Sequence, residues 1–290
     1  MSAQGGLDRT ADDRWVTVLS PETRWLDFRL GELWRYRDLV ALFVRRDFLA
    51  QYKQTVLGPA WHVIQPILTT VTFTIVFGRI ARIPTDSLPP FLFYFAGYVI
   101  WSYFATTLAK ISNTFIANAN MFGKVYFPRM AIPVSISISS MISFGIQFAL
   151  FLGFLAYFQM RGAPVDPNAW LLASPLLVVL MGALGLGFGI IVSSLTTRYR
   201  DMTNLVAFGV QLLMYATPIV YPLSAVPERY RLVVLVNPMS ALVEAFRFGF
   251  LGAGTVSVGH LAYSVVFTVA ILMCGVLLFN RVERNFMDTV

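Results

Sequence analysis

Six long apolar segments follow one another along most of the chain, and short polar segments separate them. Each is close to the ~20 residues that a helix needs to cross the hydrocarbon core of a membrane. The apolar positions run together and do not alternate as they would in a half-buried strand. The pattern predicts an all-helical polytopic membrane protein with these spans: Gly58–Ile80, Pro90–Ile111, Ile132–Met160, Trp170–Leu195, Thr203–Tyr221 and Val256–Phe279.

The distribution of positive charge sets the expected orientation. With the N-terminus inside, 16 of the 22 Lys and Arg residues fall on the cytoplasmic side and six fall outside. Cytoplasmic loops carry such an excess of cations. We therefore expect a multi-pass protein of the cell inner membrane with both termini cytoplasmic, and the net charge of +7 calls for no nucleic-acid partner. No short apolar core with a cleavage site opens the chain, so no signal peptide is expected.

The chain before the first span divides into two parts. Residues 1–24 form a polar extension, and residues 25–57 carry a helical pattern with cations on the remaining faces. Such a helix is typical of the membrane interface. We predict an amphipathic cytoplasmic helix here, and a simple anchor is the alternative. The apolar positions that recur every four residues are Val40, Val44, Phe48 and Tyr52.

Residues 222–254 are too apolar for an ordinary outer loop. Prolines divide the segment into short pieces, of which Leu232–Val236 and Ala241–Leu251 are mostly apolar. We expect short re-entrant helices within a transmembrane domain that covers residues 58–290, and a surface-lying amphipathic segment is the alternative. Glu244 and Arg247 are three residues apart and are expected to pair on one helix.

Polar and aromatic side chains recur at helical spacing in the first and fifth predicted spans. Lipid cannot satisfy amide groups, so these faces must meet protein or a hydrated path. Hydroxyls, amides and aromatic rings suit a sugar, and hydrogen bonding inside a dry bundle is the alternative. The residues of the first span are Trp61, His62, Gln65, Thr69, Thr72 and Phe73; those of the fifth are Asn204, Phe208, Gln211 and Tyr215.

Small residues in two other spans predict close helix packing. Gly185, Gly187 and Gly189 lie inside an apolar segment with no strand before it, which argues against a dinucleotide loop. A second set repeats every four residues in the third span and is expected to pack in the same way. Its members are Ser135, Ser139, Ser143 and Gln147.

Several absences narrow the function. No G-x-x-x-x-G-K-[ST] sequence occurs, so the chain has no P-loop of its own. No Asp or Glu falls inside a predicted span, which disfavours an ion-coupled carrier. One Cys and two His leave little material for a metal site, and no catalytic set can be assembled. We expect a protein that is not itself an enzyme and that holds neither a metal nor a cofactor.

The polar connection between the second and third spans combines amides, aromatic residues and cations over Ser112–Arg129. An amphipathic helix with exposed aromatic side chains in a cytoplasmic loop is typical of a docking element. A turn lying on the membrane surface is the alternative.

Taken in order, several motifs resemble those of ABC-2 type permeases that export cell-surface polysaccharides, namely the O-antigen, teichoic acid and capsule exporters. The similarity extends from about Leu33 to Gly252 and leaves out the chain before Trp25. The motifs are Arg45–Trp61, Gln65-Pro66, Val76–Arg79, Asn118–Asn120, Lys124–Arg129, Tyr199–Asp201, Thr217–Pro222 and Asn237–Met239.

The resemblance implies a homodimer that works with two copies of a separate ATPase subunit, which would hold ATP and Mg. It implies export of an undecaprenyl-type lipid-linked polysaccharide through a channel lined by the first and fifth spans. A coupling helix over about 113–126 would contact the ATPase through Asn118, Asn120, Met121, Phe122 and Lys124.

The resemblance also implies roles for residues at the two membrane faces. On the cytoplasmic side, the substrate's pyrophosphate would meet Arg45, Arg46, Tyr52 and Lys53. On the outer side, the region 222–254 and the turn before it would form a gate that includes Pro218, Tyr221, Pro222, Glu244 and Arg247.

Two other functions stay open at this point. A drug or small-lipid exporter of the same superfamily would need the same ATPase but a drier channel. A membrane-embedded glycosyl- or acyltransferase would need acids near a membrane face, and only Asp47, Asp201 and Glu244 could serve.

Overall fold

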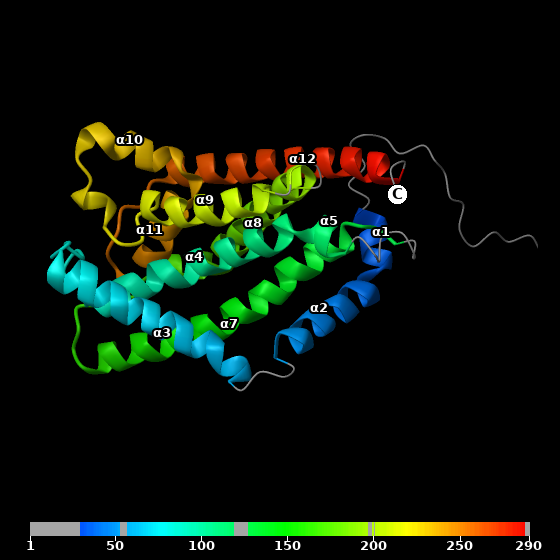
Figure 1. Cartoon of the computed structure of the whole chain (residues 1–290). Coiled ribbons are helices and arrows are strands. Elements are labelled where there is room, and N and C mark those ends of the chain that lie inside the picture. The colour runs from blue at the N-terminus through cyan, green and yellow to red at the C-terminus, as the bar shows by residue number, and fades with distance from the viewer. Residues whose placement is uncertain (1–29, 53–56, 119–126, 197–198, 200, 288–290) are drawn as a thin grey trace, which may run out of the picture.

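The structure is a computed structural model, and it describes residues 30–52, 57–118, 127–196, 199 and 201–287. Every regular element in these residues is a helix or a helical turn. The long helices run side by side along one direction, with α10 and α11 at one end of the bundle and α1 and α2 at the other (Figure 1). The described chain is therefore all-helical, as the sequence predicts.

Five helical segments are long and apolar enough to cross a membrane. They are α3 (Trp61–Phe73) with its π-helical continuation η2 (Thr74–Ile80), α4 (Pro90–Ser112), α7 (Ala131–Met160), α8 (Ser174–Thr196) with the preceding turn η3 (Ala169–Ala173), and α12 (Val258–Met287). The shorter elements are α1 (Leu30–Arg35), α2 (Arg37–Tyr52), η1 (Gly58–Ala60), α5 (Thr114–Ala117), α9 (Met202–Ala216), η4 (Leu223–Ala225), α10 (Glu228–Val236) and α11 (Pro238–Leu251).

The fifth predicted span, Thr203–Tyr221, differs from the structure in length. Its helix, α9, has 15 residues and is therefore about 22 Å long, which is short of the ~30 Å hydrocarbon core. The helix ends at Ala216 because Pro218 disfavours the helical conformation of the residue before it. Thr217 accordingly has extended angles, φ −99° and ψ 142°.

Helix α8 packs closely against α4 on one side and α12 on the other. A Cβ atom on Gly189 would come within 2.7 Å of Ile111 on α4, and one on Gly187 would come within 3.0 Å of the Leu272 amide nitrogen on α12. Gly185 also faces α4. The predicted role of these glycines in close packing is confirmed, because each occupies a place where any larger residue would push two helices apart.

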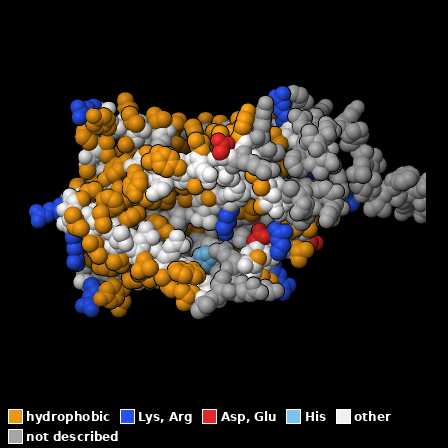
Figure 2. Space-filling view, in the orientation of Figure 1, with side chains coloured by type: hydrophobic (Ala, Val, Ile, Leu, Met, Phe, Trp, Pro, Cys, Tyr) orange, Lys and Arg blue, Asp and Glu red, His pale blue; other side chains and the backbone are white. Residues whose placement is uncertain are grey.

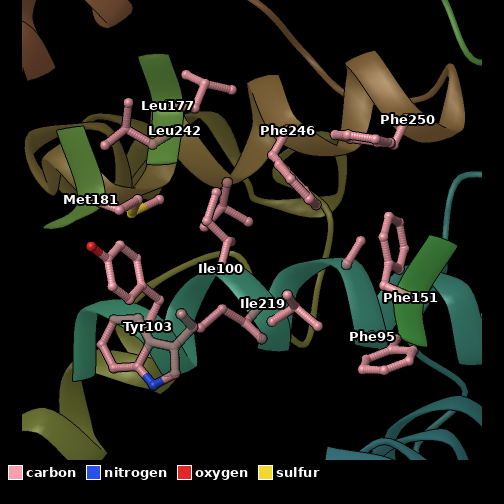
Figure 3. Close-up of a cluster of buried hydrophobic side chains, with 14 of the residues drawn as sticks. Phe95, Ile100, Tyr103, Phe151, Leu177, Met181, Ile219, Leu242, Phe246 and Phe250 are labelled. Atoms are coloured by element: carbon pink, nitrogen blue, oxygen red, sulfur yellow. The ribbon is translucent and has the colours of Figure 1, made fainter. Parts of the chain in front are cut away.

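Aromatic side chains fill the core toward the end of the bundle where α11 lies. Phe95 of α4 and Phe151 of α7 meet edge to face at 5.9 Å, and Phe246 and Phe250 of α11 lie against Phe151 (Figure 3). All four rings are at most 2% exposed. Offset and edge-to-face arrangements such as these are favoured over parallel sandwiches. They join α4, α7 and α11 into one apolar core.

The predicted polar stripe of α7 also faces the interior. Ser135, Ser139 and Ser143 are buried, and Gln147 accepts a hydrogen bond of 2.6 Å from the Ser102 hydroxyl on α4. Because these small side chains let the helices approach and satisfy one another's polar groups, the stripe acts in packing. The prediction for the third span is confirmed.

The N-terminal helix α2 lies along the beginning of α7. Its apolar face includes Val40 and Phe43, which are buried, and Val44 and Phe48, which are half-buried. Phe43 meets Phe127 edge to face at 5.7 Å. A helix therefore exists in the predicted region 25–57, with one side on the bundle and both charged and apolar residues on its exposed sides.

The segment 222–254, where the sequence predicts short re-entrant helices, contains the two short helices α10 and α11. Helices α10 and α11 meet at a bend of 99°. The bend has a local cause, since Asn237 caps α11 by accepting the Met239 amide hydrogen and Pro238 occupies the first helical turn. Helix α12 secures the bend through hydrogen bonds of 2.8 Å from Tyr263 to the Val236 carbonyl and from Ser264 to the Pro238 carbonyl.

The close contact between α8 and α12 yields a test. A Cβ on Gly275 would lie 2.8 Å from the Gly187 carbonyl oxygen, a backbone atom that cannot move aside alone. We expect Gly275→Ala to cost about 1–3 kcal/mol, the usual cost of overpacking. The measurement is the midpoint of thermal unfolding in one detergent.

Gly153→Ala is the matched control, because Gly153 lies on the exposed side of α7 and a methyl group added there would have no neighbouring atom within 4 Å. Its unfolding midpoint should stay the same or rise, since alanine has the higher helix propensity. Equal midpoints for Gly275→Ala and the wild-type protein would show that the two helices are not in tight contact.

Candidate functional site

The polar and aromatic stripe of α9 lies on an open side of the chain. Asn204 and Gln211 are exposed, and so are Phe208 and Tyr215, with 61% and 45% of their surface accessible. No residue of α9 is buried. The four side chains share a face because they follow steps of four, three and four residues. The predicted stripe is thus continuous and available to another surface.

The stripe of α3 is divided between three environments. Trp61 is 50% exposed, Gln65 is exposed and Thr69 is half-buried. The His62 imidazole Nε2 lies 3.4 Å from the Ser143 hydroxyl, so this ring faces α7. Trp61, Gln65 and Thr72 are therefore exposed in the same way as the α9 stripe, whereas His62 and Thr69 are not.

Phe73 does not share this surface. It is 8% exposed and meets Phe77, Tyr94 and Tyr98 edge to face at 5.5–6.4 Å. Its place in a predicted channel lining is therefore not reproduced within one copy of the chain. The physical reason is that α3 presents this side to α4, where an aromatic cluster excludes solvent.

Helices α3 and α9 both pack on α4. Hydrophobic side chains cover much of the surface over these helices, and Lys and Arg gather mainly toward the ends (Figure 2). Apolar surface of this extent is ordinary where lipid is the solvent, but exposed amides such as Gln65 and Gln211 are not. These amides set the surface apart from a plain lipid-facing side.

The two arginines predicted for the pyrophosphate lie on different faces of α2. Arg46 pairs with Asp47 at 2.8 Å and its guanidinium stands 4.8 Å over the Phe43 ring. Arg45 is exposed beside α7. The side chain of Tyr52 and the whole of Lys53 lie outside the described residues, so these two assignments stay predictions.

The predicted docking segment 113–126 is described only at its start. Helix α5 (Thr114–Ala117) contains Phe115, which is buried and stacks on Phe279 of α12 at 4.7 Å. The Asn118 amide donates to the Thr114 carbonyl at 2.9 Å. The remaining predicted contacts, Asn120, Met121, Phe122 and Lys124, lie outside the described residues.

A buried ion pair joins Glu244 and Arg247, two of the predicted gate residues, on helix α11. The Arg247 Nη1 donates to Glu244 Oε1 at 3.0 Å, and both side chains are at most 2% exposed. The Arg247 Nη2 donates to the Ile219 carbonyl at 2.7 Å, and the guanidinium lies 3.7 Å from the Phe93 ring centre. The predicted pairing of these two residues is confirmed.

The second carboxylate oxygen of Glu244 is also satisfied. Oε2 accepts hydrogen bonds from the amide and hydroxyl of Thr255 at 3.1 and 3.4 Å. The pair therefore joins α4, the turn after α9, α11 and the segment before α12. A buried charge that lacked any of these contacts would be strongly unfavourable.

Sequence reasoning missed the partners of this arginine on α4. A Cβ on Gly97 would lie 2.7 Å from Arg247 Nη2, so the guanidinium fits only because residue 97 has no side chain. Phe93 supplies both its ring and its carbonyl, the latter at 3.4 Å from Arg247 Nε. A glycine one turn after an aromatic residue is a weak signal, and nothing in the spacing connects it to a residue 150 positions away.

The other predicted gate residues lie in the turn after α9. Pro218 and Pro222 are buried, and Tyr221 is half-buried beside a cavity of about 360 Å³. Side chains of α4, α8, α9, α10 and the start of α11 line the rest of this cavity, together with the bend between α10 and α11. The Asn237 amide donates to the Thr217 hydroxyl at 2.8 Å and ties this turn to the bend between α10 and α11.

Breaking the buried pair should destabilise the fold strongly. Arg247→Met leaves the Glu244 carboxylate buried without its cation, which typically costs about 3–5 kcal/mol. We expect a large loss of monodisperse protein and a lower unfolding midpoint in detergent. The double variant Glu244→Leu/Arg247→Met removes both charges and should recover part of the loss.

Arg229→Met is the matched control, since this exposed arginine only stands over the neighbouring Tyr230 ring at 4.5 Å. Its midpoint should equal that of the wild-type protein. A double variant no more stable than Arg247→Met would contradict the assignment of the cost to an unpaired carboxylate.

Known proteins are similar to this chain in sequence and in length. The O-antigen export system permease protein RfbA of Klebsiella pneumoniae is 26% identical over 263 residues, which cover 91% of this chain and 98% of the relative. The polysialic acid transport protein KpsM of Escherichia coli is 24% identical, with coverages of 86% and 95%. The inner membrane transport permease YadH of Escherichia coli K12 is 23% identical over 73% of this chain and 84% of its own length.

Residues 38–251 match the family described as ABC-2 type transporter. The matched region extends from α2 to the end of α11 and so contains the spans α3, α4, α7 and α8, the α9 stripe and the buried ion pair. Because the match covers well over half of a multi-pass helical chain, this protein belongs to the ABC-2 type transporter family.

Proposed function

We propose that the chain is the membrane-spanning permease subunit of an ABC transporter that exports a lipid-linked polysaccharide. The similarity to permeases named for O-antigen and polysialic acid transport, along nearly the whole chain, supports this choice of cargo. The sequence contains no P-loop, so a separate ATPase subunit must supply the nucleotide chemistry, with ATP and Mg bound there.

The observation that carries the proposal is the exposed stripe of α9. Its two amides and two aromatic rings point away from the chain's own core. Amide groups left in lipid would be costly, because hydrocarbon offers them no hydrogen-bond partner. A second copy of the chain, related by a twofold axis, would let these faces enclose a hydrated passage.

The chemistry of that passage suits a glycan. Gln211 and Asn204 can exchange hydrogen bonds with sugar hydroxyls, while Phe208 and Tyr215 offer flat apolar faces to the C–H side of a sugar ring. No carboxylate lies between Asn204 and Tyr215, so a neutral polymer would meet no fixed charge along this part of the helix. Trp61 and Gln65 of α3 would extend the lining.

The energy of ATP hydrolysis would enter through the segment 113–126. Helix α5 at its start is buried against α8 and α12, with the Phe115 and Phe279 rings stacked. A push on this segment would therefore act on a packed body and not on a loose loop, and packed bodies shift as rigid units. The expected placement has both termini and this segment on the cytoplasmic side of the inner membrane, which the bias of Lys and Arg supports.

Loss of one ring of the stripe should slow export. In a strain that lacks the chromosomal copy, Tyr215→Ala should lower surface glycan roughly two- to tenfold, as expected for one lost aromatic contact. The measurement is the amount of glycan at the cell surface at equal permease levels. Tyr157→Ala on α7 is the matched control, because that ring is also exposed, at 51% against 45% for Tyr215.

Three outcomes separate the proposal from other functions. Unchanged glycan in Tyr215→Ala would show that the ring does not meet the cargo. Normal glycan in the deletion strain, together with new sensitivity to small apolar compounds, would favour a drug or small-lipid exporter. Turnover of a glycosyl or acyl donor by the purified chain without an ATPase would favour a transferase.

Charge placed in the docking segment should uncouple the complex. Met121→Asp with Phe122→Asp should leave membrane insertion intact but abolish export, because two carboxylates would be desolvated at the contact with the ATPase. The measurement compares export with ATP hydrolysis in the reconstituted complex. Met160→Asp, a change at the highly exposed outer end of α7, is the control. Normal export by the double variant would place the ATPase contact elsewhere.

A further inference from the structure

An apolar groove between α2 and the beginning of α7 lies apart from the α9 stripe. Its volume is about 780 Å³, within the about 300–1,000 Å³ that small-molecule sites usually occupy. Side chains at helical spacing form its two walls. They are Val40, Val44 and Phe48 of α2, and Val134, Ile138 and Ile142 of α7.

The groove is open and has the length of an acyl chain in one leaflet. Ile138 and Ile142 are 42% and 39% exposed, so the described residues leave its α7 wall open. From Arg37 to Phe48, α2 extends about 16 Å, and half of a ~30 Å hydrocarbon core is about 15 Å. The stretch from Arg45 to Arg37 makes up about 12 Å of this length, so an acyl chain whose phosphate lies on Arg45 would occupy that part of the groove.

Arg45 places a positive charge in the α2 wall of this groove. No carboxylate of the described residues pairs with it, whereas its neighbour Arg46 is paired with Asp47 at 2.8 Å. A guanidinium next to apolar surface favours a phosphate, which it can hold with two parallel hydrogen bonds. The groove thus combines apolar walls with one cation that lacks a described counter-charge.

A second arginine lies at the far part of the groove. Arg37 is eight residues before Arg45, about 12 Å along the helix, so one phosphate cannot reach both. Arg37 already has Asp38 at 4.0 Å and Trp34 beneath its guanidinium at 5.6 Å. Arg45 is accordingly the better partner for an added anion.

We propose that this groove binds an anionic glycerophospholipid of the membrane, with its phosphate on Arg45 and one acyl chain along α2 and α7. The site does not depend on the identity of the exported cargo, since it needs only a membrane that contains such lipids. The bound lipid would fill the space between α2 and the bundle and hold the helix at the membrane surface.

Native mass spectrometry of the full chain in detergent tests the site. The probes are phosphatidylglycerol and phosphatidylcholine with identical acyl chains, added separately at equal concentrations. Both lipids carry the phosphate, but the choline cation of phosphatidylcholine is repelled by Arg45 and cancels the lipid's net negative charge. We therefore expect about tenfold higher retention of phosphatidylglycerol. Arg45→Gln should lower its retention to the level of phosphatidylcholine.

Two matched pairs of variants test whether lipid retention depends on the groove itself or only on the general charge and hydrophobicity of the protein. Arg46→Gln should retain phosphatidylglycerol as the wild-type protein does, because that guanidinium is turned to Asp47 and Phe43. Ala41→Trp fills the groove and should abolish retention of both lipids. Ala50→Trp should not, since nine residues at 100° each place Ala50 on the opposite face of α2.

Other results would overturn the assignment. Equal retention of the two lipids by the wild-type protein would remove the role of Arg45. Undiminished retention by Ala41→Trp would show that no acyl chain enters the groove. Displacement of phosphatidylglycerol by an equimolar polyprenyl diphosphate would make the carrier lipid the occupant. A gain in retention after deletion of residues 1–29 would show that the chain's own N-terminal segment fills the groove.

Discussion

A guanidinium buried among helices in a membrane protein must find all its partners within the chain, because neither water nor lipid can replace them. Arg247 meets that condition through Glu244, the Ile219 carbonyl and the Phe93 ring. These partners belong to three parts of the chain, namely α11, the turn after α9 and α4. Glu244 and Arg247 lie on the same helix, so their own hydrogen bond would survive if the turn after α9 or helix α11 moved away, but Arg247 would lose its bond to the Ile219 carbonyl. The cost of losing that bond inside the protein favours movement of these parts together, whatever the net contribution of the ion pair to stability.

Close packing also prevents the helices at the centre of the bundle from moving separately. Helix α8 lies so near α4 and α12 that methyl groups at Gly187 or Gly275 would meet backbone atoms. Sliding between such surfaces requires the helices to separate first, since backbone atoms cannot yield as flexible side chains do. Helix α9 differs, because none of its residues is buried and a cavity of about 360 Å³ lies beneath it beside Tyr221. Relative motion within one copy of the chain is thus easiest between α9 and the α4–α8–α12 body.

The hydrophobic pattern of the sequence predicted most of this fold, because a helix that crosses a membrane needs about 20 consecutive, mostly apolar residues. Five spans, the packing role of Gly185 and Gly189, and the pairing of Glu244 with Arg247 were predictable from local spacing. The length of α9 was not, since its hydropathy continues past Ala216 while Pro218 ends the helix. Phe73 shows a second feature that the sequence alone did not predict. Its spacing places it beside the polar stripe of α3, but only the three-dimensional position of Tyr94 and Tyr98 reveals that this side is covered.

The exposure of α9 explains why its stripe is the part of the described chain that most needs a partner. A helix of about 22 Å with no buried residue gains little from its own subunit, so its position depends on what lies against its exposed face. Amides at Asn204 and Gln211 make lipid a poor neighbour, and the rings of Phe208 and Tyr215 make bulk water a poor one. In the proposed dimer, this surface would face a second copy of itself, with polar material between the two. The fixed body and its buried ion pair would then hold the walls of a passage whose inner surface is supplied by α9.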